Sequence, residues 1–416
     1  MLSQLHRDAQ AIIQRVILEN LPEEGVRQAL DGHKFLGNIW AVAIGKAAWT
    51  MAKAAGEHLG ERLKGGVVIT KYGHAKGDLP GMEIIEAGHP ISDENTFMGT
   101  EKAIALAERL GKEDELLFLV SGGGSALFEA PMDGIGLSDL AMINNCLLAC
   151  GADIIEINMI RKRLSKVKAG RFAKMAEPAR VFAVVLSDVL GDRLDTIASG
   201  PAAPDLSCTA DAQKIISTYE IKLTELQRRC ILEETPKDTP NVKTIVTGSV
   251  RTLCQSAGKA AEEQGYKPFI LTTSLGCHAR EAGHFLASIA RDIQRGESSI
   301  QKPCAVIAGG ETVVRLTGTG KGGRNQELVL SAAKGISGLA DTVIFSVGSD
   351  GTDGPTDAAG GIVDGETLAK LQSTGISIDM ALADNDSYNA LKAVGGLVIT
   401  GPTGTNVNDT CVVLCR

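Results

Sequence analysis

The sequence of 416 residues has few aromatic side chains, no long apolar run and no excess of basic charge. Aromatic residues make up 4% of it. No apolar stretch approaches the roughly 20 residues that a membrane-spanning helix needs. The 50 acidic residues outnumber the 42 basic ones, giving a net charge of −8. This balance argues against a protein that binds duplex nucleic acid, which needs a basic surface, but it allows a local basic pocket for an anionic metabolite.

Several signature motifs are also absent. The nine cysteines form no C-x-x-C pair and the seven histidines no H-E-x-x-H pattern, so we expect reduced thiols in a cytoplasmic protein and no zinc site. No Gly-Lys pair is followed by Ser or Thr, so there is no Walker A motif. The run Gly123-Gly124-Ser125-Ala126 continues into Leu127, which excludes a nucleophile elbow. No G-x-G-x-x-G opens a helix after a strand, so a nicotinamide-dependent dehydrogenase is poorly supported.

Glycine, by contrast, is abundant: 48 of the 416 residues are glycine, about 12% of the chain, whereas the average usage is about 7%. Because 44% of the chain is hydrophobic and its apolar residues come in ordered runs, the excess does not reflect low-complexity sequence. We expect the glycines at tight turns and where the backbone approaches a ligand closely.

Short β-branched runs alternate with helical patterns, which is typical of βαβ units and a mainly parallel sheet. We predict two α/β domains, at residues 1–235 and 240–416, joined by the proline-containing polar segment 233–241. Ser92 is the expected N-cap of a helix over 93–110. Whether the last strand returns to the first domain stays open. The predicted strands span 39–44, 67–70, 84–87, 116–120, 181–186, 244–247, 269–272, 305–308, 343–347, 397–400 and 411–414.

Three loops of the first half follow predicted strands and contain candidate site residues. Gly45-Lys46 would present an ammonium group at a helix start, which favours an anion, although an ordinary strand-to-helix turn fits equally well. Ser121-Gly122-Gly123-Gly124-Ser125 contains three consecutive glycines, which favours a phosphate or carboxylate site built from backbone amides. Asp188, followed by Asp192, occupies a position that often holds magnesium in phosphoryl-transfer sites, and a capping aspartate is the alternative.

In the second half, Glu311 and the glycine-rich run 318–323 precede Arg324 at the start of a predicted helix. A planar guanidinium suits bidentate contact with phosphate or carboxylate. For a lone arginine the alternative is a surface ion pair with Glu327, and the glycine-rich context favours the functional interpretation.

The last candidate loop spans 348–357 and is rich in aspartate. It looks superficially like an EF-hand loop, but Pro355 or Thr352 occupies a ligand position in either frame. We therefore expect Asp350 and Asp353 to serve Mg²⁺ or a general base rather than a dedicated calcium site.

Nine segments occur in a fixed order along the chain: AIGKAA (43–48), VSGGGSAL (120–127), RKRLSKVKAGRFA (161–173), SDVLGD with IASGP (187–192 and 197–201), GGET (309–312), GTGKGGRNQE (318–327), GSDGTDGPTDAAG (348–360), NDSYNAL (385–391) and TGPTGTNVND (400–409). Together they resemble the glycerate 2-kinase family whose C-terminal half is called the MOFRL domain. The resemblance implies transfer of the ATP γ-phosphate to the 2-hydroxyl group of D-glycerate. It also implies an N-terminal Rossmann-like domain with a parallel sheet, a C-terminal α/β domain with a mixed sheet, and an active site in the cleft between them.

The family's important lysine and arginine match Lys46 and Arg324, and the expected catalytic set is Lys46, Arg324 and Asp188. Lys46 would hold one face of the transferring phosphate and Arg324 would neutralise it from the other domain, so domain closure would precede chemistry. ATP is the expected cosubstrate, and Mg²⁺ the expected metal, held by Asp188, Asp350 and Asp353. Alternatively, Asp188 or Asp192 would accept the proton of the substrate hydroxyl group. The residues expected to bind substrate or phosphate are Gly45, Ser121, Gly122, Gly123, Gly124, Ser125, Asp192, Glu311, Gly322, Gly323 and Asn325.

Two other functions stay open. Members of this family have also been labelled hydroxypyruvate reductases, and such an enzyme would oxidise NAD(P)H without ATP. A non-catalytic sugar-phosphate sensor would bind its ligand without transferring phosphate, and it would not need so many aspartates beside its loops. For the kinase, the expected partners are glycerate and ATP, and we expect binding to neither nucleic acid nor a membrane. The protein is expected in the cytoplasm, and a homodimer is one possible assembly.

Overall fold

The structure is a computed structural model that describes residues 3–416. The chain divides into two compact units. The central unit is Gly25–Thr247, and the terminal unit combines the residues up to Glu24 with Gly248–Arg416. This division differs from the domains predicted at 1–235 and 240–416.

The segment 233–241, expected as a linker, folds back within the central unit. The amide of Asp205 donates to the carbonyl oxygen of Pro236 (3.0 Å), and the side chain of Asn241 donates to the carbonyl oxygen of Ala173 (2.9 Å). Because the segment is hydrogen-bonded to its own unit, its prolines and polar residues mark a packed loop, and the chain leaves the unit only after β6.

The central unit contains a six-stranded sheet with the order β3-β2-β1-β4-β5-β6. The neighbours among β1 to β5 are paired in parallel, which confirms the prediction of a Rossmann-like α/β fold for the first half. The inner strands are buried along almost their whole length, as expected of a parallel sheet covered by helices on its faces. The strands are β1 (Asn38–Ile44), β2 (Leu63–Lys71), β3 (Met82–Ala87), β4 (Asp114–Val120), β5 (Arg180–Leu186) and β6 (Val242–Gly248).

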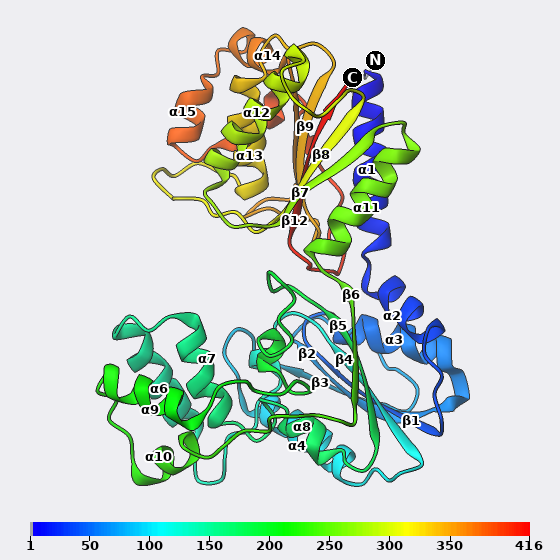
Figure 1. Cartoon of the computed structure of the whole chain (residues 1–416), viewed down its shortest axis with the longest axis vertical. Coiled ribbons are helices and arrows are strands. Elements are labelled where there is room, and N and C mark those ends of the chain that lie inside the picture. The colour runs from blue at the N-terminus through cyan, green and yellow to red at the C-terminus, as the bar shows by residue number, and fades with distance from the viewer. Residues whose placement is uncertain (1–2) are drawn as a thin grey trace. The chain divides into compact units, whose positions relative to one another are not determined.

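Helices α4 and α8 share one apolar core with the sheet, and α3 packs against β1 and β2 (Figure 1). Helix α4 is capped by Asp93, whose carboxylate accepts the amide of Thr96 (3.0 Å). The prediction of Ser92 as the N-cap was wrong by one residue, because the Ser92 hydroxyl donates to the carbonyl oxygen of Ala126 instead (2.7 Å). The elements are α2 (Pro22–Asp31), α3 (Ala48–Leu59), η1 (Gly60–Arg62), α4 (Glu94–Glu108), α5 (Gly124–Leu127), α8 (Arg171–Met175) and η2 (Ile197–Ser199).

Four further helices of the central unit form a separate helical lobe with its own apolar cluster, which includes Ile143, Leu147 and Ile160 (Figure 1). Buried Arg163 ties the lobe together, because its guanidinium donates to the carbonyl oxygens of Ile231 (3.2 Å) and Glu233 (2.8 Å). The helices are α6 (Leu137–Ala149), α7 (Ile154–Arg163), α9 (Thr209–Thr218) and α10 (Glu225–Ile231).

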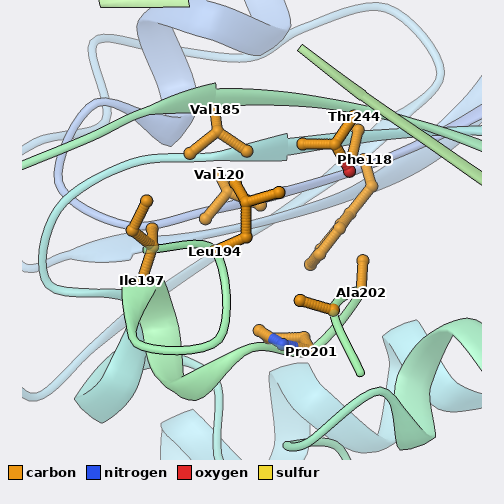
Figure 2. Close-up of a pocket in the computed structure, with 10 residues that line it drawn as sticks. Phe118, Val120, Val185, Leu194, Ile197, Pro201, Ala202 and Thr244 are labelled. Atoms are coloured by element: carbon orange, nitrogen blue, oxygen red, sulfur yellow. The ribbon is translucent and has the colours of Figure 1, made fainter. Parts of the chain in front are cut away.

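A small apolar cavity lies between β4, β5 and the segment that follows β5 (Figure 2). Its volume is about 20 Å³, so it has room for about one water molecule, and its apolar walls give that water few partners. It is a gap in the core and not a metabolite site. The labelled side chains around it are Phe118, Val120, Val185, Leu194, Ile197, Pro201, Ala202 and Thr244.

The terminal unit has a second six-stranded sheet with the order β11-β10-β9-β12-β8-β7. Strands β7 and β8 are parallel, whereas β12 is antiparallel to both β8 and β9, which confirms the predicted mixed sheet. The strands are β7 (Lys267–Leu275), β8 (Cys304–Gly310), β9 (Thr342–Gly348), β10 (Gly360–Asp364), β11 (Leu397–Val398) and β12 (Asp409–Cys415).

Helices α1 and α11 cover one face of this sheet, and α12 and α13 cover the other (Figure 1). The helices are α1 (Gln4–Glu19), α11 (Val250–Glu263), α12 (Ala279–Arg295), α13 (Arg324–Gly335), α14 (Thr367–Ser373), α15 (Ile378–Ala383) and α16 (Ser387–Ala393).

The last strand, β12, lies between β8 and β9 and so stays in the terminal unit. The first helix, α1, is the element that packs in a unit formed mostly by the distant C-terminal part of the sequence. The hydroxyl of Tyr266 donates to the buried carboxylate of Asp8 in α1 (2.7 Å), and the Asn20 side chain donates to the hydroxyl of Ser256 in α11 (3.2 Å). Over the described residues, no helix combines the length and hydropathy that crossing a membrane requires.

Candidate active site

The central sheet has a topological switch point between β1 and β4. From β1 the strand order runs to β2 and β3 on one side and to β4 and β5 on the other. Ligands of such sheets bind in the crevice beyond the carboxyl ends of the two strands at this point. Gly45-Lys46 follows β1, and the glycine loop, Ser121–Ser125, follows β4, so the two predicted loops are neighbours.

The two loops are hydrogen-bonded to each other. The Ser121 hydroxyl donates to the carbonyl oxygen of Ile44 (3.1 Å) and accepts the amide of Ala47 (3.1 Å). The amide of Lys46 donates to the carbonyl oxygen of Gly122 (2.9 Å). Ser121 was predicted to bind substrate, and the structure places it 3% exposed with its hydroxyl committed to these backbone groups. The Ser121 hydroxyl therefore joins the glycine loop to the turn after β1.

The backbone at Gly45 and the glycine loop is too crowded for side chains. A Cβ on Gly45 would collide with Ser121, and one on Gly122 would collide with the carboxylate of Asp188. A Cβ on Gly123, where φ is +83°, would lie 3.0 Å from Cδ2 and Nε2 of His89 and 3.3 Å from Cε of Lys46. Three chemically capable side chains, those of Lys46, His89 and Asp188, therefore converge on two consecutive glycines.

Lys46 is the positive charge of this group. Its side chain is half-buried, and no hydrogen bond or ion pair from residues 3–416 engages its ammonium group. The ring of His74 contacts the carbonyl oxygen of Lys46 (3.0 Å), which holds the backbone at this residue. A half-buried ammonium without a protein counter-ion suits an anionic ligand.

His89 is a site residue that sequence reasoning missed. Burial lowers the pKa of its imidazole, and the positive charges of Lys46 and Lys71 and the ring of His74 lower it further. The ring is therefore neutral at pH 7. Its position in the sequence could have pointed to it. His89 comes two residues after the predicted strand 84–87, just as the other candidate site loops come directly after predicted strands.

A buried ion pair supports the far end of the glycine loop. The Lys168 ammonium is fully buried, donates to the carbonyl oxygen of Ser125 (2.8 Å) and pairs with the carboxylate of Glu129. The hydroxyl of Ser125 hydrogen-bonds that of Ser199 (3.0 Å). Lys168 was also missed, although it lies in a recognised segment, 161–173.

Asp192 forms the turn after β5, with φ of +52° and its amide bonded to the carbonyl oxygen of Val189 (3.1 Å).

The terminal unit contains a second candidate site, a cavity of about 750 Å³. This volume falls in the range of about 300–1,000 Å³ that is usual for small-molecule sites. Its lining includes Glu311, Val313, Leu316, Gly318, Gly320, Gly322, Gly323, Arg324, Asp350 and Asp353. Most of the predicted residues of this half are therefore neighbours around one cavity.

Arg324 is the first residue of α13, as predicted, and its guanidinium is held by two carboxylates. Nε and Nη2 donate to the two oxygens of Asp409 (2.5 and 3.0 Å), and Nη1 donates to Glu311 (2.9 Å). Glu327, the alternative ion-pair partner considered from the sequence, pairs with Arg280 instead (3.2 Å). Because a guanidinium has five donors, two of Arg324 are left over for a ligand.

A short turn clamps the glycine-rich run 318–323. The Asn385 carboxamide oxygen accepts the amides of Thr317 (2.7 Å) and Gly318 (3.0 Å), and its nitrogen donates to Glu327 (3.1 Å). The carboxylates of Asp384 and Asp386 accept the next amides, those of Thr319 (2.9 Å) and Lys321 (3.0 Å). The segment 385–391 was recognised in the sequence, but its role as a clamp becomes visible only in three dimensions.

Two predicted residues of this half are used inside the protein. Asn325 is 2% exposed, and its carboxamide oxygen accepts the hydroxyl of Ser346 (2.6 Å). The carboxylate of Asp353 accepts the amides of Asn325 (3.1 Å) and Gln326 (2.8 Å) at the start of α13. Burial raises the pKa of Asp353 to about 6 despite these bonds. Both residues therefore fix the first turn of the helix that carries Arg324, and Asn325 does not line the large cavity.

Comparison with known proteins fits this arrangement. Residues 8–232 match the family model of a domain of unknown function, DUF4147, and residues 304–409 match the MOFRL family. The chain is 51% identical over 403 residues to the D-glycerate 2-kinase of Thermotoga maritima, with 97% of this chain and 96% of that protein covered. This chain belongs to the glycerate 2-kinase family with a MOFRL domain. Membership confirms the resemblance found in the sequence.

A solved structure and a second relative extend the comparison. The crystal structure of a glycerate kinase from Thermotoga maritima matches this chain with a TM-score of 0.96 at 50% identity, covering 99% of each chain. A protein of Agrobacterium vitis that bears the name of a hydroxypyruvate reductase is 38% identical over 410 residues, with 96% of this chain and 90% of that protein covered. The family therefore includes both names, and its fold is the one described above.

Proposed function

We propose that this chain is a glycerate 2-kinase that transfers the γ-phosphoryl group of ATP to the 2-hydroxyl group of D-glycerate. The observation that carries the proposal is the convergence of Lys46, Asp188 and the glycine loop at the switch point of the sheet, in a chain of this family. Phosphoryl transfer demands positioning and charge neutralisation more than covalent chemistry, and these residue types supply both.

In the central unit, Lys46 binds an oxygen of the transferring phosphoryl group, because its ammonium has no protein counter-ion to displace. Because Gly45, Gly122, Gly123 and Gly124 lack a Cβ, the backbone can approach an anionic oxygen of either glycerate carboxylate or phosphate. The donors proposed for it are the amides of Gly122 and Gly123, since the amide of Gly124 already donates to the carbonyl oxygen of Ser121 (3.3 Å). The hydroxyl of Ser125 lies at the end of this loop, and Asp192 stands in the next one as a further polar contact.

In the terminal unit, the cavity of about 750 Å³ receives the rest of the nucleotide. Its glycine-rich wall, including Gly322 and Gly323, lets phosphates approach the backbone, and Arg324 offers its two remaining donors to them. The carboxylate of Glu311 accepts a hydrogen bond from the Arg324 guanidinium and so helps to orient it. Lys46 and Arg324 are proposed to act on one phosphoryl group, which a double-mutant cycle tests through a non-additive loss of kcat/KM.

Mg²⁺ fits the residues of this chain. Carboxylate oxygens are its preferred protein ligands, and it commonly takes only one or two of them together with substrate phosphates. No cluster of three or more metal-ligating side chains occurs within residues 3–416, which suits a metal held largely by ATP. Asp188 beside the glycine loop and Asp350 at the second cavity would hold it, whereas both oxygens of Asp353 already accept amides. When bound, Mg²⁺ neutralises charge on the β- and γ-phosphates.

The experiment that tests the proposal is a coupled assay of ADP release by the purified protein with ATP and Mg²⁺. We expect release that depends on D-glycerate. A parallel assay offers hydroxypyruvate and NAD(P)H without ATP, and oxidation of the nicotinamide there with no glycerate-dependent ADP would establish the reductase instead. Binding of glycerate and ATP without turnover would identify the sensor. The chain lacks a dinucleotide-binding motif at the switch point, where Gly45-Lys46 leads directly into α3, and this favours the kinase.

We also propose that the enzyme acts in the cytoplasm and forms a homodimer. Light scattering of the purified protein across a concentration series measures the oligomeric state, and fractionation of cells measures the location.

A further inference from the structure

We infer that His89 is the general base that accepts the proton of the glycerate hydroxyl group during phosphoryl transfer. The inference rests on the proposed function and deepens it, because it assigns a role in that reaction to a residue outside the expected catalytic set.

Position is the first reason. His89 follows the carboxyl end of β3, as Lys46 follows that of β1 and the glycine loop that of β4, so all three lie at the same end of the parallel strands. The edge of its ring that contains Nε2 lies against Gly123, 3.0 Å from where a Cβ would stand. The Cε atom of Lys46 lies 3.3 Å from the same point. A substrate bound over Gly123 would therefore meet the imidazole and the ammonium group together.

Availability is the second reason. No protein group within residues 3–416 hydrogen-bonds to the His89 ring, so its nitrogens are free to engage a substrate. His74, by comparison, spends a ring nitrogen on the carbonyl oxygen of Lys46. A half-buried imidazole with no protein partner is unusual unless water or a ligand completes its hydrogen bonds.

Charge is the third reason. The groups whose charge acts on the His89 ring are Lys46 after β1 and Lys71 and His74 at the end of β2. Two carboxylates lie near the same loops, since Asp93 accepts the backbone amide of Gly88 and Asp188 lies against Gly122. Burial and the neighbouring positive groups lower the pKa of the imidazole below its ordinary value of 6.5. The neutral ring has an acceptor nitrogen, which an ammonium group never has. Lys46 can hold the anion but cannot take the proton.

The proposed step conserves atoms and charge. The O–H bond of the 2-hydroxyl group breaks, and its proton passes to the acceptor nitrogen of His89. The hydroxyl oxygen forms a bond to the γ-phosphorus as the bond from that phosphorus to the β,γ-bridging oxygen breaks, and ADP leaves with the electron pair. The imidazolium then releases its proton to water.

The test compares kcat/KM for D-glycerate across pH in the wild type, His89→Gln and the control His58→Gln. His58 is a histidine of the same unit whose ring faces Asp31 (3.6 Å), and its replacement should leave the profile unchanged. The wild-type profile should rise with pH through one titration with a midpoint below 6.5, because only the neutral ring accepts a proton. In His89→Gln, kcat should fall by about 10²- to 10⁴-fold and the acidic limb should disappear.

A second variant keeps the inference testable if a glutamine disturbs the site. His89→Ala leaves a space beside Gly123, and added imidazole should restore part of its rate, which a purely structural role would not produce. The inference is overturned if His89→Gln retains kcat within about threefold, if it loses rate but keeps the wild-type acidic limb, or if the wild-type limb has a midpoint near 4, as a carboxylate base would give. Failure of the proposed function looks different, since the wild type itself would then release no ADP with glycerate.

Discussion

Replacing Gly123 by alanine tests the geometry of the site most specifically. Two effects are expected, and they can be separated. The first is backbone strain, because φ at Gly123 is +83° and a residue with a Cβ in this region loses about 1–2 kcal/mol. The second is displacement, because the new Cβ would lie 3.0 Å from the ring of His89 and 3.3 Å from Cε of Lys46, both closer than comfortable contact.

Gly151→Ala supplies the matched control. Gly151 has nearly the same φ, +78°, but it is exposed and no atom lies within 4 Å of where its Cβ would stand. Both variants should therefore lose a similar free energy of unfolding in urea, measured by circular dichroism. Only Gly123→Ala should also lose about 10²-fold in kcat for glycerate-dependent ADP release, because misplacing reacting groups by about 1 Å has an effect of this size. Equal kcat values for the two alanine variants would refute the convergence of Lys46 and His89 on Gly123.

Three other predictions follow from particular contacts. Arg324→Lys should lower kcat/KM by about 10- to 100-fold, because an ammonium lacks the planar fork with which the guanidinium contacts both Asp409 oxygens and still presents two donors. Steady-state kinetics that match the wild type would contradict the assignment. Lys168→Met should destabilise the protein by about 3–5 kcal/mol, because it leaves the Glu129 carboxylate buried without a counter-ion. The double variant with Glu129→Leu should recover most of that stability. Equal stabilities of the single and double variants in urea would contradict the role given to this ion pair. Tyr266→Phe should lower the stability of the terminal unit by about 1–3 kcal/mol, since the α1 carboxylate loses a buried donor, and thermal unfolding unchanged by the substitution would show that α1 is held by other contacts.

Much of the site could be predicted because its signals are local. Lys46 and the glycine loop each follow an apolar strand, and the carboxyl ends of parallel strands meet at one edge. Their adjacency depends on the pairing of β1 with β4, which the sequence does not display. His89 escaped notice for the same reason, since its importance comes only from the ring's position over Gly123.

Buried polar residues show the limit of what the sequence displays. Asn325 follows a glycine-rich run and has the side chain of a ligand contact, but Ser346, from a strand distant in sequence, satisfies it in the interior. Helix α1 shows the same limit, because an amphipathic sequence favours a helix with one buried face but does not say which sheet that face covers. In the structure the hydroxyl of Tyr266, 258 positions along the sequence, donates to Asp8. Both contacts join residues that are separated in the sequence, so neither is visible in it.

The central claim is that the phosphate is placed on the 2-hydroxyl group of glycerate, and phosphorus NMR of the product tests it most directly. In 2-phosphoglycerate the phosphorus couples to the single proton on C2 and gives a doublet, whereas in 3-phosphoglycerate it couples to two protons and gives a triplet. The purified chain, incubated with ATP, Mg²⁺ and D-glycerate, should produce the doublet. A triplet would place the phosphate on the other carbon and contradict the 2-kinase assignment, and the absence of any new phosphomonoester signal would contradict the kinase itself.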